Sequence, residues 1–153
     1  MRASVARQAT AGHYRRRGCG RPAAATEEFP TGARLSLDDA GRLLVRPDLS
    51  RWSDGRCTFV GELKYRYDTG EGDTPNLYQT LAYATAAGLP DAMLIYADGP
   101  SAGTTHQLPH AGFRIHVRHL DLAAPLDDLR EQIRSRADHI ETLTPGQASP
   151  ARA

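Results

Sequence analysis

Apolar and polar residues alternate over two stretches, near residues 43–51 and 57–66, which is the pattern of half-buried β-strands. Asp54 and Gly55 lie between them, and an Asp-Gly pair is typical of a two-residue hairpin turn. We therefore expect the two strands to pair as an antiparallel hairpin. Folded structure is expected to begin shortly before it, near Ala33.

A helix is predicted after the hairpin. Leu77, Leu81 and Ala84 recur at helical spacing and should form a buried stripe. Thr74 is expected to be the N-cap, because the Pro that follows it fits the first helical position. Gly88, followed closely by Pro, should end the helix.

Two further strands and a second helix complete the pattern. Residues 92–96 form an uninterrupted apolar run, as expected of a strand buried on both faces, and apolar residues alternate over 113–117. A last helix should cover the sheet with one apolar face, formed by Leu126, Leu129, Ile133, Ala137 and Ile140. The order of elements predicts an α/β fold with a mixed sheet flanked by helices.

The length of 153 residues corresponds to about one domain. Residues 1–30 are rich in Ala, Arg, Gly and Thr without periodicity, so we expect a disordered basic leader there. The folded domain should span residues 31–143, and residues 144–153 are expected to be a disordered tail.

Composition narrows the class of function. A formal net charge of +1 is not that of a strongly basic, autonomous DNA-binding protein, so any grip on DNA should be local or supplied by a partner. The two cysteines lack the spacing of a zinc site. Neither a signal peptide nor a membrane span is predicted, so we expect a cytoplasmic protein without membrane contact.

The polar residues that could bind a metal ion or catalyse a reaction lie on the predicted hairpin. Side chains alternate between the faces of a strand, so Glu62 and Lys64 should point to one side and Leu63 to the other. The hairpin should bring Asp48 near Glu62. Together with the backbone carbonyl of Leu63, these two carboxylates offer the hard oxygen ligands that a divalent cation prefers, with Lys64 beside them.

The first predicted helix offers two more polar side chains. Gln79 and Tyr83 are four residues apart and so share a face of that helix, a face that we expect to look back at the carboxylates on the sheet.

The order of these motifs is specific: PDL at residues 47–49, ELKY at 62–65, LYQTLAYA at 77–84 and AMLIYA at 92–97. Over about residues 35–141 the chain resembles the nuclease domain of McrC, the cleaving subunit of the McrBC modification-dependent restriction systems. That domain belongs to the restriction-endonuclease-like PD-(D/E)xK superfamily.

The resemblance implies a metal-dependent DNA endonuclease. Asp48 and Glu62 would be metal ligands, Lys64 the catalytic lysine, and Gln79 and Tyr83 the helix residues that orient the site. It implies Mg²⁺ as the cofactor, with Mn²⁺ as a substitute, DNA as the substrate, and a separate McrB-like GTPase motor subunit as a partner for recognition and translocation.

Two features of the chain depart from the family; the first concerns the motor partner, and the second is chemically mild. We expect no room for the sizeable N-terminal region by which McrC-like subunits engage their motor, and Glu62 stands where the family often has Asp. The chain is therefore also compatible with a non-catalytic or truncated module that binds a partner or nucleic acid. A structure-specific repair nuclease of the same fold is the third hypothesis.

The other acidic residues and the histidines are not expected to bind a metal ion. Asp68, Glu71 and Asp73 are interpreted as a mobile, solvated acidic loop rather than as added metal ligands. His116 and His119 are three apart in a predicted strand and so should face opposite sides, which argues against a histidine metal site.

Overall fold

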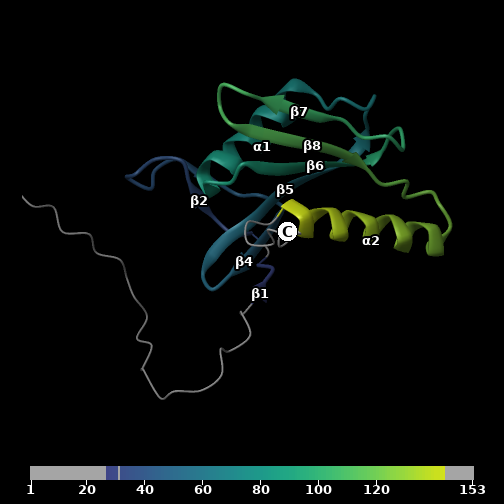
Figure 1. The fold of residues 1–153 in the computed structure, drawn as a ribbon, viewed down its shortest axis with the longest axis horizontal. Coiled ribbons are helices and arrows are strands. Elements are labelled where there is room, and N and C mark those ends of the chain that lie inside the picture. Colours follow the sequence, from purple (N-terminus) through teal and green to yellow (C-terminus); the bar gives the residue numbers. More distant parts are fainter. Residues whose placement is uncertain (1–26, 31, 144–153) are drawn as a thin grey trace, which may run out of the picture.

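The computed structural model describes residues 27–30 and 32–143. They form an α/β protein with a six-stranded mixed sheet and two helices (Figure 1). In sheet order the strands are β1 (Glu27–Glu28), β4 (Leu49–Ser53), β5 (Arg56–Tyr67), β6 (Asp91–Asp98), β8 (Phe113–His119) and β7 (Thr105–Leu108). A separate pair is formed by β2 (Leu35–Ser36) and β3 (Leu44–Val45). The predicted α/β class is confirmed.

The predicted hairpin is present as β4 and β5, which pair antiparallel. Asp54 and Gly55 form its turn with φ values of 49° and 76°, the positive pair that a type I′ turn requires. The first strand is shorter than predicted, because it begins at Leu49, and β3 pairs with β2 instead. Pro47, which has no backbone N–H to donate, separates the two segments.

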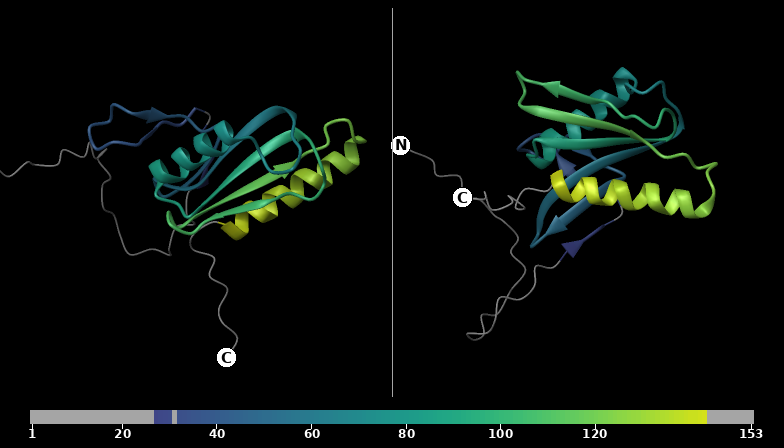
Figure 2. Two further views of the ribbon diagram at one scale, coloured as in Figure 1. Left: turned by 90° about the horizontal axis from the view of Figure 1, so that it is seen from above. Right: turned by 45° about the vertical axis from the view of Figure 1, so that its right-hand side comes forward.

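The strands that follow run parallel: β5 pairs with β6, and β6 pairs with β8. Between β5 and β6 lies α1 (Thr74–Ala87), which covers one face of the sheet (Figure 2). Its N-cap is Asp73 rather than Thr74, so the predicted start was late by one residue. Gly88 ends the helix in the left-handed conformation, as predicted.

The core lies on both sides of β6. Residues 91–96 of this strand are all buried, which confirms the prediction of a strand covered on both faces. Val60 and Ala92 pack with Tyr83 of α1 on one face. Phe59, Met93 and Ile95 pack on the other face.

The second helix, α2 (Leu126–Leu143), lies on the opposite face from α1 (Figure 2). It covers the sheet less than predicted: Ile140 and Leu143 pack on the core, whereas Leu126 and Ile133 are 61% and 51% exposed. The chain leaves β8, extends beyond the end of that strand and turns back, so α2 begins away from the sheet (Figure 1). Only its last turns reach the core.

The expected leader reaches too far along the chain. Glu27 and Glu28 form β1 and pair with Ser53 and Trp52, so they belong to the sheet. The side chain of Arg51 is buried and forms ion pairs with Glu27 and with Glu141 of α2, the latter at 2.8 Å. The rest of the leader, residues 1–26, and the expected tail, residues 144–153, lie outside the described residues.

Within residues 27–30 and 32–143, neither helix has the length and apolar character that crossing a membrane requires.

Candidate active site

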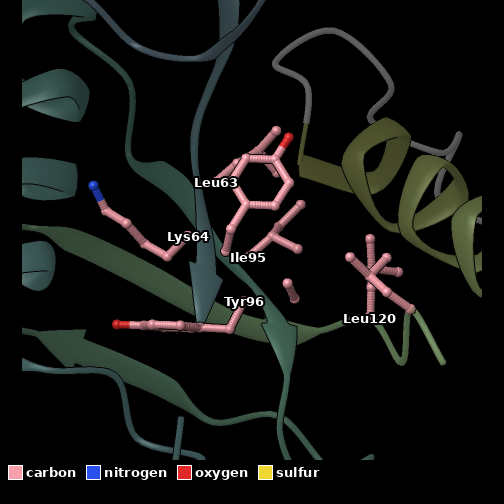
Figure 3. Close-up of a pocket in the computed structure, with 8 residues that line it drawn as sticks. Leu63, Lys64, Ile95, Tyr96 and Leu120 are labelled. Atoms are coloured by element: carbon pink, nitrogen blue, oxygen red, sulfur yellow. The ribbon is translucent and has the colours of Figure 1, made fainter. Parts of the chain in front are cut away.

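The candidate residues on β5 point toward α1. By register, Lys64 lies opposite Tyr96 of the neighbouring strand, and Leu63 lies opposite Ile95. Figure 3 shows that Leu63 and Ile95 face α2 while Lys64 and Tyr96 extend to the other side of the sheet. The hollow in that figure, of about 150 Å³, is mostly apolar and lies across the sheet from the Lys64 amine.

A chain of short contacts connects β5 to α1. The Lys64 amine donates to Glu62 Oε1 at 2.6 Å and to Gln79 Oε1 at 3.2 Å. The Gln79 amide in turn donates to the Tyr83 hydroxyl at 2.6 Å. The structure therefore brings Glu62, Lys64, Gln79 and Tyr83 together, in the arrangement that the helix spacing and the strand alternation predict.

Two side chains of this cluster, those of Glu62 and Tyr83, are buried. Glu62 is only 4% exposed, and its Oε2 atom is buried without a hydrogen-bond partner among the described residues. Burial raises the pKa of Tyr83 to about 12, and the charges of Glu62 and Asp48 act in the same direction, against the hydrogen bond from Gln79. Tyr83 is therefore a neutral phenol near neutral pH, facing both carboxylates.

Asp48 joins the cluster from the segment before β4. It is exposed, and its Oδ2 atom accepts a hydrogen bond from the backbone N–H of Leu63 at 3.0 Å. The N–H and C=O of one strand residue point to the same side. The carbonyl of Leu63 is therefore directed toward Asp48, away from β6.

The donor set fits a hard divalent cation. Asp48, Glu62 and the Leu63 carbonyl supply oxygen atoms, and a buried carboxylate oxygen without a partner is a group that a cation would satisfy. The described ranges contain no group of three or more His, Cys, Asp or Glu side chains placed to hold a metal. Mg²⁺ commonly binds through one or two carboxylates and keeps several waters, so two carboxylates suffice for it.

One signal in the sequence strengthens the case for Lys64. Among the 19 lysine and arginine residues of the chain, Lys64 is the sole lysine. Arginine carries a wide planar fork, whereas lysine presents a compact ammonium. The sole lysine of the chain therefore stands where a side-chain ammonium must fit between Glu62 and Gln79.

The sequence predicts a solvated acidic loop, but two of its carboxylates, those of Asp68 and Asp73, are bonded within the fold. Asp68 is buried and accepts hydrogen bonds from the backbone of Gly70 at 2.7 Å and Gly72 at 3.1 Å, and from His119 at 3.0 Å. Burial alone would raise the pKa of Asp68, but these hydrogen bonds outweigh it and lower the pKa. The sequence signal for the burial of Asp68 is the pair Gly70 and Gly72, because their backbone N–H groups donate to its carboxylate.

Asp73 in the same loop is also engaged. Its carboxylate forms an ion pair with Arg66 and accepts a hydrogen bond from the Tyr96 hydroxyl at 2.7 Å. The carboxylates of Asp68 and Asp73 are thus used within the fold and add no ligand to the candidate site.

His116 and His119 face opposite sides of the sheet, as predicted. His116 donates to Asp91 at 2.8 Å on one side, and His119 donates to Asp68 on the other. The two rings therefore belong to different clusters.

No protein-family model matches this chain, and no curated protein has a significantly similar sequence.

Proposed function

We propose that this chain is a Mg²⁺-dependent endodeoxyribonuclease that hydrolyses DNA phosphodiester bonds, with Mn²⁺ able to replace Mg²⁺. We further propose a restriction-endonuclease-like PD-(D/E)xK fold of the McrC type. The observation that carries the proposal is the contact of Lys64 with both Glu62 and Gln79, beside a buried Glu62 oxygen that has no hydrogen-bond partner among residues 27–30 and 32–143.

Each residue has a physical role in this proposal. Asp48, Glu62 and the Leu63 carbonyl would hold the cation, which when bound lowers the pKa of water and neutralises charge on the phosphate. The ammonium of Lys64 would stabilise negative charge that develops on the phosphate and orient the attacking water.

The helix residues keep that ammonium in place. Gln79 accepts from Lys64, and its amide is held in turn by Tyr83, which stays neutral because its pKa is about 12. Tyr83 is therefore a positioning residue, and so is Gln79. An ammonium that is already held in place needs no reorganisation during the reaction, so its support by Gln79 and Tyr83 should favour catalysis.

The arrangement of elements supports the fold proposal. The hairpin of β4 and β5 places Asp48 beside Glu62 and Lys64, and α1 crosses over to the parallel strand β6. This is the order in which the motifs of the resemblance occur along the chain.

Recognition of the substrate would come from elsewhere. The net charge of +1 gives little general attraction to DNA. By the resemblance, we propose a GTP-driven McrB-like subunit as the partner that recognises and translocates DNA.

The proposal is tested by incubating plasmid DNA with the purified chain and Mg²⁺, Mn²⁺ or a chelator. We expect metal-dependent nicking that is lost in Asp48→Asn and Glu62→Gln, because each removes a charged ligand. Asp54→Asn, which changes an exposed acid at the hairpin turn, is the matched control and should cleave normally. Absence of cleavage by the folded protein, with and without a GTPase partner, would favour the non-catalytic module instead.

A further inference from the structure

Tyr96 lies beside Lys64 but is not part of the cluster described above. In the parallel pairing of β5 and β6, Tyr96 is opposite Lys64, and both side chains extend to the same side of the sheet (Figure 3). Tyr96 is only 1% exposed and packs in an apolar cluster with residues of β6, β8 and α1. A phenol at this depth needs partners for its hydroxyl, because a buried polar group without hydrogen bonds is costly.

Three hydrogen bonds connect the Tyr96 hydroxyl to the start of α1. It accepts from the backbone N–H of Asp73 and from Asn76 Nδ2, each at 3.1 Å, and it donates to Asp73 Oδ1 at 2.7 Å. A phenolic hydroxyl has one proton and can accept with two lone pairs, so these bonds use its whole capacity. Burial raises the pKa of Tyr96, so the hydroxyl keeps the proton that it donates to Asp73.

These bonds take the place of the usual helix cap. Asp73 is the N-cap residue of α1, but its side chain makes no capping hydrogen bond to the helix. An N-cap carboxylate normally accepts from a backbone N–H in the first turn. Here one oxygen of Asp73 accepts from Tyr96, and the other pairs with Arg66 of β5. The start of α1 is therefore held by side chains of the sheet.

The bond to Asn76 acts on the part of α1 that holds Lys64. Asn76 is buried and lies three residues before Gln79, so the two are neighbours on the helix. Thr80, the residue after Gln79, donates to the backbone carbonyl of Asn76 at 2.8 Å. Asn76 and Gln79 thus belong to one hydrogen-bonded stretch of helix, and a displacement of Asn76 carries Gln79 with it.

The contact between Gln79 and Lys64 tolerates little displacement. Gln79 Oε1 lies 3.2 Å from the Lys64 amine, at the long end of the range for N–H···O hydrogen bonds, and a further 0.4 Å or about that would break it. Leu77 and Leu81 also hold α1 on the sheet, but their contacts are apolar and have no preferred direction. The directional bonds of Tyr96 are therefore better suited to fix the position of the helix.

We infer that Tyr96 is a positioning residue for Lys64: its hydroxyl fixes the first turns of α1, and α1 in turn sets where Gln79 holds the ammonium. The consequence for catalysis rests on the proposed function. Because Tyr96 acts through Gln79, loss of its hydroxyl should affect Lys64 only while Gln79 is present.

The ammonium NMR signal of Lys64 tests the inference without DNA or metal. Lys64 is the sole lysine, so the signal is assigned without ambiguity. Tyr96→Phe removes only the hydroxyl and should shift the signal toward that of Gln79→Ala, in which the contact is lost outright. The double variant should match Gln79→Ala, because residues that act through one contact are not additive.

Tyr78→Phe is the matched control, since it removes a hydroxyl from an exposed tyrosine of the same helix. It should leave the Lys64 signal unchanged. In single-turnover cleavage with saturating Mg²⁺, Tyr96→Phe should be slower by about tenfold, because small displacements of a reacting group are costly. The affinity for DNA should not change, because Tyr96 is buried and cannot reach DNA.

A wild-type Lys64 signal in folded Tyr96→Phe would overturn the inference. Additive effects of Tyr96→Phe and Gln79→Ala on that signal would overturn it as well. If Tyr96→Phe does not fold, Asn76→Ala removes the helix side of the same contact and must shift the signal in the direction of Gln79→Ala; an unchanged signal there would also overturn the inference.

Failure of the nuclease proposal would look different. A wild-type chain that never cleaves DNA, but whose Lys64 signal shifts in Tyr96→Phe, would refute only the catalytic assignment. Metal-dependent cleavage with equal Lys64 signals in wild type and Tyr96→Phe would refute only the role of Tyr96.

Discussion

Removal of the Lys64 ammonium should destabilise the fold through Glu62. The carboxylate of Glu62 is 4% exposed, Lys64 is bonded to Oε1, and Oε2 has no partner among the described residues. Lys64→Ala therefore leaves a buried carboxylate without the ammonium that pairs with it. Breaking one side of a buried pair costs about 3–5 kcal/mol. Because the Lys64 side chain is 23% exposed and water can enter, we expect the lower end, about 3 kcal/mol.

The free energy of unfolding is measured by urea denaturation in metal-free buffer near pH 7.5. Glu62→Gln added to Lys64→Ala should recover most of the loss, because a neutral amide is far less costly to bury than an unpaired carboxylate. Arg66→Ala is the control: it breaks the exposed ion pair with Asp73 on the same strand and should cost less than about 1 kcal/mol. A Lys64→Ala variant as stable as the wild type, or a double variant less stable than the single one, would refute the reasoning.

Three other outcomes follow from the structure. Burial, with help from nearby Arg118, lowers the pKa of His139 from 6.5 to about 4, so stability should fall as the pH drops from 6.5 to 4; His139→Gln should flatten this dependence in urea titrations. Gly99→Ala should cost about 3 kcal/mol or more by thermal unfolding, because its Cβ would strike His119 and its φ of 152° suits glycine. As the sole lysine, Lys64 gives one ammonium NMR signal, which added Mn²⁺ should broaden in wild-type protein but not in Glu62→Gln.

Local rules predicted much of the fold and the grouping of the site. The Asp54–Gly55 turn fixes the hairpin, and strand alternation places Glu62 and Lys64 on the face that α1 covers. The spacing of Gln79 and Tyr83 then brings Gln79 into contact with Lys64 and lets Tyr83 hold the Gln79 amide. Each of these features depends on residues a few positions apart.

Features that depend on distant parts of the chain were not predictable in this way. Glu27 joins the sheet because it pairs with β4 and forms an ion pair with Arg51. No pattern in the neighbouring sequence predicts these contacts. Asp68 has the sequence of a solvated turn, yet His119, far along the chain, buries it. The apolar stripe of α2 is real, but its start lies beyond the sheet, so Leu126 remains exposed.

The most direct test of the nuclease assignment is the single-turnover rate of Mg²⁺-dependent DNA cleavage by Lys64→Ala, compared with wild type and Arg42→Ala. Arg42 is an exposed cation paired with Asp38, so Arg42→Ala matches the change in charge without touching the site. We predict that Lys64→Ala is slower by at least about a hundredfold, the usual effect of losing one preorganised charge, while Arg42→Ala keeps the wild-type rate. Cleavage by folded Lys64→Ala at the wild-type rate would contradict the assignment.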